Sequence, residues 1–323
     1  MSLKEICNGL RCWFDKFRGA PNPRQMDSER RPEDTYTSPT KKETTRSTEN
    51  YSASTTSNNA LTMALLGNTG NGVSATGNSI LKMPAFESKR SSGSVTSTSE
   101  MKDAVVDGKL VKVIDTPGLF NFLLRADFVV KEIVKCIESA KDGIHAVVVV
   151  LSVRSPYSKE EVTAIQGLKI LFGDKISDYL IFVFTGGDEL EDDQTLDDYL
   201  EDECPQPLKE FLKSYRDRTV LFDNKTKNDE KKDNQVKQFL SIVDTVVAKN
   251  GGKPYKNEFF VQLHERTDKT YEERLKEVRD KVASKLKQTI SKLQQQLAEE
   301  KSDPELARET KALRMKLKDC AIL

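Results

Sequence analysis

Residues 67–74 read Gly67-Asn68-Thr69-Gly70-Asn71-Gly72-Val73-Ser74, which matches the phosphate-binding pattern G-x-x-x-x-G-K-[ST] at every fixed position but one. Glycines let backbone N–H groups curl around phosphate oxygens, and the positive end of a following helix attracts the same anions. Ser74 stands where the Mg²⁺-binding hydroxyl belongs, whereas Val73 stands where a lysine would contact the β- and γ-phosphates. The stretch therefore predicts a phosphate cradle that lacks its main cation.

The residues on either side of this stretch have the pattern that a phosphate-binding loop requires. An apolar run at 61–66 comes before it, and residues 75–82 are a plausible helix. A strand, a loop and a helix in this order separate a real phosphate-binding loop from a chance match to the pattern. We therefore expect the loop to lie between a buried strand and the start of a helix.

A second apolar run, 110–114, leads directly into Asp115-Thr116-Pro117-Gly118. An acidic residue at the end of such a strand can hold Mg²⁺ through water, and the N–H of the glycine can sense a γ-phosphate. This segment predicts a switch element beside the phosphate loop.

Two later strands end in polar loops that suit a base. The run 179–184 ends in Thr185-Gly186-Gly187-Asp188, and the run 219–222 leads to Asp223-Asn224-Lys225. The carboxylate of Asp188 can accept hydrogen bonds from the N1–H and 2-amino groups of guanine, a donor pair that adenine lacks. Ligands of doubly wound sheets bind at the carboxyl ends of the strands. The order of these motifs predicts an α/β fold of the P-loop GTPase type, with a doubly wound, mostly parallel sheet.

Four stretches together resemble a known family: GNTGNGVSATGNSIL, DTPGLF, LSVRSPYSKEE and FTGGDELED. They are similar to the AIG1-type GTPases, also called the immune-associated nucleotide-binding or GIMAP family, and the TGGD form most resembles the plant branch. The stretch LSVRSPYSKEE resembles a box of the family's own, between its third and fourth nucleotide motifs. The resemblance covers about residues 59–265, and the chain departs from it at Val73, where relatives carry lysine.

The resemblance implies a site for GTP or GDP with Mg²⁺. Ser74, Asp115 and a switch threonine would hold the metal, and that threonine is Thr96, with Thr98 as the alternative. The implied nucleotide-binding residues are Gly67, Asn68, Thr69, Gly70, Asn71, Gly72, Val73, Ser74, Ala75, Ser88, Thr96, Gly118, Asp188 and Asn224. No glutamine follows DTPG in the position that orients water in Ras-like enzymes, so no catalytic residue is assigned and GTP hydrolysis stays open.

The missing lysine has a calculable cost. A charge-assisted contact to phosphate contributes roughly 1.5–3 kcal/mol net, so its loss lowers affinity on the order of 10- to 150-fold. Lys82 lies about two turns along the same helix and points elsewhere, which leaves Lys89, Arg90 and Arg154 as candidate substitutes. We expect weakened GTP binding and slow or absent hydrolysis.

The overall charge argues against a nucleic-acid partner. Lys and Arg total 51, and Asp and Glu also total 51, so no net field attracts an anionic polymer. The five cysteines have neither metal-binding spacing nor a disulfide pattern, which suits the reducing cytosol.

Composition divides the chain into four regions: 1–19, 20–58, 59–265 and 266–323. The first has the spacing of an amphipathic helix, which would bind a membrane surface or a partner, dock on its own domain, or stay disordered. The second is Ser/Thr-rich and is predicted to be a disordered linker. The third is the nucleotide domain, and the fourth is a helical, coiled-coil-like extension.

The fourth region carries two predictions. Its apolar residues between 271 and 300 recur every three or four positions, which favours either packing on its own domain or self-association as a homo-oligomer. The final Cys320-Ala321-Ile322-Leu323 fits the C-a-a-X pattern for geranylgeranylation, with basic residues just upstream. We expect attachment through Cys320 to the cytosolic face of a membrane.

Two functions stay open. The first is a membrane-associated switch in which guanine nucleotide orders the segments around Thr96 and Gly118. The second is a pseudo-GTPase scaffold that assembles on membranes through its helices and lipid. Ser74, Asp115 and Asp188 favour the switch, whereas Val73 favours the scaffold. By resemblance, the context would be a stress or immune response.

Overall fold

The computed structural model describes residues 60–88, 98–117, 126–154, 159–191 and 193–302. All of them belong to one compact unit. The regions 1–19 and 20–58, and Cys320, lie outside the described residues, so the expectations for them stay predictions.

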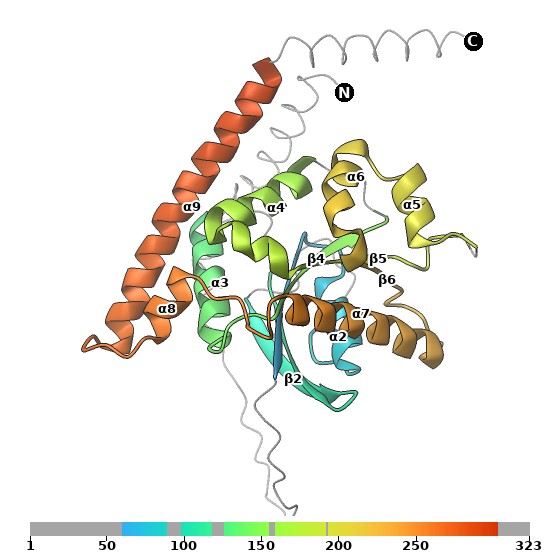
Figure 1. The fold of residues 1–323 in the computed structure, drawn as a ribbon, viewed down its shortest axis with the longest axis horizontal. Coiled ribbons are helices and arrows are strands. Elements are labelled where there is room, and N and C mark those ends of the chain that lie inside the picture. Colours follow the sequence, from blue (N-terminus) through green and yellow to red (C-terminus); the bar gives the residue numbers. More distant parts are fainter. Residues whose placement is uncertain (1–59, 89–97, 118–125, 155–158, 192, 303–323) are drawn as a thin grey trace, which may run out of the picture. The chain divides into compact units, whose positions relative to one another are not determined.

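Six strands form one sheet in the order β2-β3-β1-β4-β5-β6 (Figure 1). Their bounds are β1 (Leu61–Gly67), β2 (Glu100–Val106), β3 (Lys109–Asp115), β4 (Ala146–Ser152), β5 (Leu180–Thr185) and β6 (Thr219–Phe222). All neighbouring pairs are parallel except β2 with β3. The predicted doubly wound, mostly parallel sheet is confirmed. Because the strand order reverses at β1, the crevice for a ligand opens at the carboxyl end of this strand.

Helices cover both faces of the sheet (Figure 1). On one face, α2 (Val73–Leu81) and α7 (Asp229–Lys249) share an apolar cluster with β1 and β3. The other face carries the helices α3 (Ala126–Ser139), α4 (Lys159–Phe172), α5 (Leu196–Asp202), α6 (Gln206–Leu212), α8 (Glu258–His264) and α9 (Tyr271–Ser302). Two 3-10 turns, η2 (Asp174–Tyr179) and η3 (Lys213–Arg218), precede β5 and β6. Burial on both faces explains why β1, β4 and β5 are nearly continuous apolar runs.

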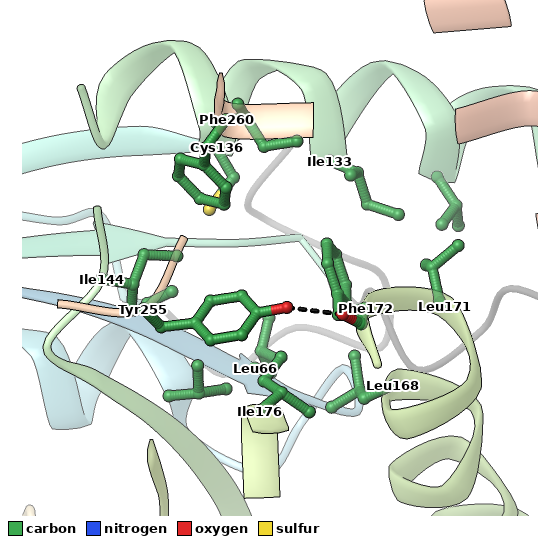
Figure 2. A pocket seen from close by; sticks show the side chains of 14 residues that line it. Leu66, Ile133, Cys136, Ile144, Leu168, Leu171, Phe172, Ile176, Tyr255 and Phe260 are labelled. Atoms are coloured by element: carbon green, nitrogen blue, oxygen red, sulfur yellow. Dashed lines mark hydrogen bonds between the residues drawn. The ribbon is translucent and has the colours of Figure 1, made fainter. Parts of the chain in front are cut away.

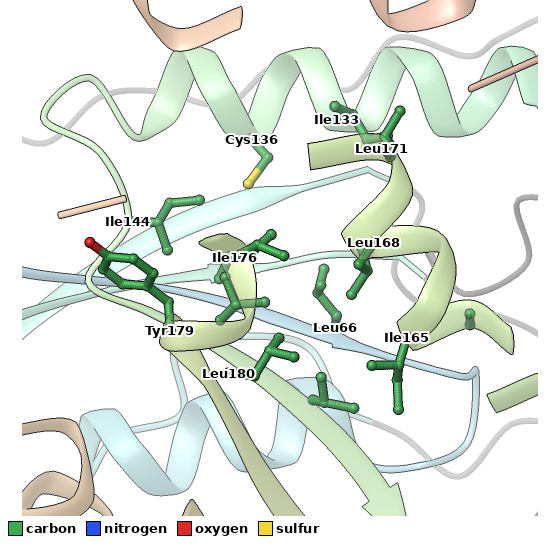
Figure 3. Close-up of a cluster of buried hydrophobic side chains, with 14 of the residues drawn as sticks. Leu66, Ile133, Cys136, Ile144, Ile165, Leu168, Leu171, Ile176, Tyr179 and Leu180 are labelled. Carbon is green, nitrogen blue, oxygen red and sulfur yellow. The ribbon is translucent and has the colours of Figure 1, made fainter. Parts of the chain in front are cut away.

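The core between the sheet and α3, α4 and α8 is apolar and contains a cavity of about 40 Å³ (Figure 2). The hydroxyl of Tyr255 donates a hydrogen bond to the carbonyl oxygen of Phe172 at the cavity wall, at 2.6 Å. Leu66, Leu168 and Ile176 meet in the same cluster (Figure 3). Burial, together with the charge of Glu132, raises the pKa of the Cys136 thiol to about 12. This cysteine is therefore a neutral core residue at physiological pH.

The long helix α9 packs against α3, α4 and α8. Its buried residues are Val278, Val282, Leu286, Thr289 and Leu293. Of the two expectations for this apolar stripe, the structure shows packing on its own domain. Within the described ranges, no helix is both long and apolar enough to cross a membrane.

The contacts of α9 predict a large effect of one truncation. Leu286 is 1% exposed, so Leu286→Ala should lower the free energy of unfolding by about 2–4 kcal/mol through lost burial and a new cavity. Lys287→Ala, at the exposed neighbouring position, should change it by less than about 0.5 kcal/mol. Urea unfolding of the full-length protein measures both. A neutral Leu286→Ala would mean that this stripe is not packed on the domain.

Candidate functional site

The phosphate-binding loop joins the end of β1 to the start of α2. Gly67 ends the strand in a tight space, because a Cβ there would lie 2.7 Å from the carbonyl oxygen of Val150. Gly72 caps α2 with a φ of 85°, a left-handed conformation that favours glycine. The two fixed glycines of the motif are therefore required by packing and by backbone conformation. The predicted strand–loop–helix arrangement is confirmed.

Val73 fills the space where relatives are expected to carry lysine. The side chain is 9% exposed, and its Cγ2 atom lies 2.9 Å from the position that a Cβ on Gly67 would take. It belongs to the apolar cluster of α2, α7 and the sheet. The residue therefore contributes apolar packing beneath the loop and no charge to it.

Ser74 and Asp115 come together at the crevice. The hydroxyl of Ser74, in the first turn of α2, donates to Oδ2 of Asp115, at the end of β3, over 2.6 Å. Asp115 is 2% exposed. A hydroxyl and a carboxylate are hard oxygen donors of the kind that Mg²⁺ prefers, so the two predicted metal residues fit that ion. Thr96 and Gly118 lie outside the described residues.

Thr98, the alternative switch threonine, is engaged away from Ser74. Its hydroxyl donates to Oε1 of Glu132 on α3 over 3.2 Å, and Lys135 donates to the same hydroxyl. The backbone N–H of Ser99 also donates to Glu132, which is 1% exposed. These contacts tie the start of β2 to α3. In this arrangement Thr98 does not contribute to the metal site.

Two side chains and one backbone carbonyl group, from three other elements, hold the phosphate loop in place. The Asn71 amide, buried at 4% exposure, donates to the carbonyl oxygen of Val150 at 3.0 Å and to Oε1 of Glu161 at 3.1 Å. Asn68 donates to the same Glu161 oxygen at 3.2 Å, and Thr185 donates to the carbonyl oxygen of Asn71 at 2.7 Å. Because groups of the protein itself hold the loop through these bonds, ordering it on binding costs less.

Sequence reasoning missed the roles of Glu161 and Thr185. Glu161 lies in LSVRSPYSKEE, the stretch that resembled a family box, and Thr185 opens the TGGD stretch. The sequence pattern marks both stretches but does not connect either residue to the phosphate loop. That connection arises only where β4, β5 and the start of α4 meet β1.

Asp188, the predicted guanine reader, lies among positive charges at the end of β5. Nη2 of Arg154 is 2.5 Å from its Oδ2 atom, and Nζ of Lys225 is 2.6 Å from the same atom. Burial pushes the pKa of the carboxyl up, but the hydrogen bond from Lys225 and the charge of Arg154 outweigh it and hold the pKa below its usual value. Asp188 is therefore ionised at neutral pH, as an acceptor for two guanine N–H groups must be.

Asn224, the second predicted guanine reader, directs its amide toward α2. Its Oδ1 atom accepts from the hydroxyl of Ser79 at 2.7 Å, and its Nδ2 atom donates to Thr76 at 3.1 Å. The side chain thus ties the loop after β6 to α2. Asn224, Ala75 and Ser88 also line one groove between α2 and α7, with a volume of about 510 Å³.

Acidic residues engage Lys82, which was excluded as a substitute for the missing lysine, and Arg154, one of the three candidates. Lys82 pairs with Asp233 at 3.0 Å and with Asp107 at 3.2 Å. Arg154 is held at the guanine end by Asp188. Lys89 and Arg90 lie outside the described residues, so their part in the site stays a prediction.

The chain is similar to immune-associated nucleotide-binding proteins from Arabidopsis thaliana. A protein from Arabidopsis thaliana, immune-associated nucleotide-binding protein 9, is 44% identical over 284 residues, which is 79% of this chain and 83% of that protein. Immune-associated nucleotide-binding protein 8 from the same plant is 49% identical over 209 residues, covering 64% of this chain and 59% of that protein.

Among solved structures, Toc33 from Arabidopsis thaliana in complex with GDP and Mg²⁺ is similar at 19% identity and a TM-score of 0.43, over 58% of this chain and 85% of that chain. The model of the AIG1 family matches residues 61–275, a range that contains the phosphate loop, Asp115 and Asp188. The chain belongs to the AIG1 family.

Proposed function

We propose that this protein is a guanine-nucleotide-binding switch of the AIG1 type that acts at the cytosolic face of a membrane. The observation that carries the proposal is the 2.6 Å hydrogen bond between Ser74 and Asp115, where the phosphate loop meets the start of α2. A buried carboxylate that contacts a hydroxyl at this position supplies the protein oxygens that would hold Mg²⁺ beside the phosphates.

The described residues suggest how the site would work. Backbone N–H groups of the loop and the positive end of α2 would hold the phosphates. Ser74 and Asp115 would hold Mg²⁺, which supplies positive charge to the phosphate oxygens when it is bound. At the other end of the crevice, ionised Asp188 would accept the guanine N–H groups. Thr96 and Gly118 would then be the residues whose segments respond to the γ-phosphate.

Val73 sets the strength of this binding. With an apolar side chain in place of the lysine, the site relies on backbone N–H groups and Mg²⁺, and the charge that develops during hydrolysis lacks its usual partner. We therefore propose weak nucleotide binding with slow or absent hydrolysis.

The alternative is a pseudo-GTPase scaffold, which the burial of Val73 in the core favours. The bonds that hold the loop in place and the ionised state of Asp188 favour binding instead.

Self-association is also part of the proposal. Because the apolar stripe of α9 is buried within the chain, an interface between copies would use another surface.

Restoring the lysine tests the phosphate cradle. Val73→Lys should tighten GTP binding on the order of 10- to 150-fold, because it restores one charge-assisted contact to phosphate. Val73→Met adds length without charge and should leave the affinity near that of the wild type. Calorimetric titration of the full-length protein with GTP and Mg²⁺ measures both variants. Equal affinities for the lysine and methionine variants would argue against a phosphate-binding loop.

Changing Asp188 tests the base. Asp188→Asn should weaken GDP binding about 10- to 100-fold and improve binding of xanthosine diphosphate, whose C2 carbonyl can accept from the new amide. Asp193→Asn, an exposed carboxylate further along the same loop, serves as the control. The measurement is a competition titration with both nucleotides. An unchanged preference for guanine would remove Asp188 from the base site.

The membrane part of the proposal rests on the C-a-a-X pattern of Cys320-Ala321-Ile322-Leu323. Cys320→Ser should move the protein from the membrane pellet to the soluble fraction, because the prenyl group supplies most of the apolar anchor. Cys12→Ser is the control and should stay with membranes. Fractionation of cells that express each variant reports the distribution. Membrane association of Cys320→Ser equal to that of the wild type would contradict the anchor.

A further inference from the structure

We infer that Arg154 is a latch on the base site: its guanidinium occupies the face of Asp188 that guanine would use, and it must move aside before the base can dock. This inference rests on the proposed guanine-binding function and adds a means of controlling it. Arg154 would thereby help to set the affinity for nucleotide, although it belongs to neither the phosphate loop nor the guanine motif.

The geometry of the contact supports direct competition. Nη2 of Arg154 lies 2.5 Å from Oδ1 and 2.5 Å from Oδ2 of Asp188. A donor at equal distance from both oxygens lies between them, on the side of the carboxylate that faces away from its own side chain. The N1–H and 2-amino groups of guanine form a donor pair that needs the same end of the same carboxylate. The two sets of donors therefore exclude each other.

The backbone holds Arg154 in this place. The N–H of Val153 donates to the carbonyl oxygen of Thr185 at 3.0 Å, which fixes the end of β4 beside the loop that carries Asp188. Gly186 lies beneath the arginine, with a φ of 90°, and a Cβ there would be 3.3 Å from Cγ of Arg154. The absence of a side chain at Gly186 gives the arginine its room.

A second acid offers the arginine an alternative partner. Nη2 of Arg154 is 2.8 Å from Oε1 of Glu189, so the guanidinium can keep an anionic partner when guanine takes Asp188. Lys225 donates to Oδ2 of Asp188 at 2.6 Å and belongs to a different loop, after β6. When the latch opens, Arg154 gives up its contact with Asp188 and keeps its contact with Glu189. The opening is therefore reversible.

The latch has a distinct thermodynamic signature. When only the open fraction of the protein binds, every ligand of the site loses affinity by the same factor. The Arg154 and Asp188 side chains are 33% and 25% exposed, so the pair is partly screened by solvent. Its removal should raise nucleotide affinity about three- to fivefold. The factor should be the same for guanine and for hypoxanthine, which lacks the 2-amino group.

The test compares Arg154→Gln with the wild type in titrations with GDP and with inosine diphosphate, using the full-length protein and Mg²⁺. We expect both nucleotides to bind about three- to fivefold more tightly to the variant, through faster association and unchanged dissociation. Glu189→Gln removes the alternative partner and should shift both affinities the other way, by about twofold. Arg216→Gln is the matched control, because Arg216 also bridges two acids, Asp197 and Glu201, without touching Asp188.

The outcomes separate this inference from the proposed function. If the wild type binds GDP and Arg154→Gln binds it no more tightly, the latch is wrong and the function stands. Weaker binding of GDP but not of inosine diphosphate would show that Arg154 assists the base directly, which also overturns the latch. If neither protein binds GDP at millimolar concentration, the proposed function itself fails.

Discussion

Gly67 ends β1 where no side chain fits, because the carbonyl oxygen of Val150 on β4 lies too close. This close approach brings the phosphate loop against β4, and the Asn71 amide then reaches that same carbonyl oxygen at 3.0 Å. Ser74, one turn further along, comes within 2.6 Å of Asp115 on the strand at the other side of β1. The candidate site thus depends on the tight junction between β1 and β4.

Charge is distributed unevenly along the crevice. At the end proposed for guanine, two cations, Arg154 and Lys225, contact one carboxylate, Asp188. The phosphate end has Val73 in place of a lysine, and the nearby Lys82 is held by Asp107 and Asp233. Binding at the phosphate end would therefore depend on backbone N–H groups, helix polarity and Mg²⁺, whereas binding at the base end would depend on competition among charged side chains.

Two residues on either side of the connection between β4 and α4, Arg154 and Glu161, contact opposite ends of the candidate site. Arg154, two residues after β4, contacts Asp188, the proposed guanine reader, and Glu161, in the first turn of α4, accepts hydrogen bonds from Asn68 and Asn71 of the phosphate loop. Both residues lie in the stretch LSVRSPYSKEE, which resembled a box of the AIG1 family. Within this stretch, Arg154 contacts Asp188 and Glu161 contacts the phosphate loop, so its described residues meet both parts of the candidate site.

The sequence by itself determined the fold type and the order of the motifs, because a buried parallel strand and a glycine loop are both encoded in neighbouring residues. The pairing of Ser74 with Asp115 also followed, since motifs at the carboxyl ends of adjacent parallel strands must meet. Thr96 and Gly118 stay predictions, as they lie outside the described residues.

Only the tertiary structure decided which partner each polar or apolar side chain takes. Asn224 turns its amide to Ser79 and Thr76, more than 140 residues away, and the apolar stripe of α9 is covered by α3, α4 and α8. Arg154 and Asp188 meet only because β4 and β5 are neighbours in the sheet. A sequence pattern shows which groups can bond or pack, but the partner that each one takes depends on distances set by the packing of the whole domain.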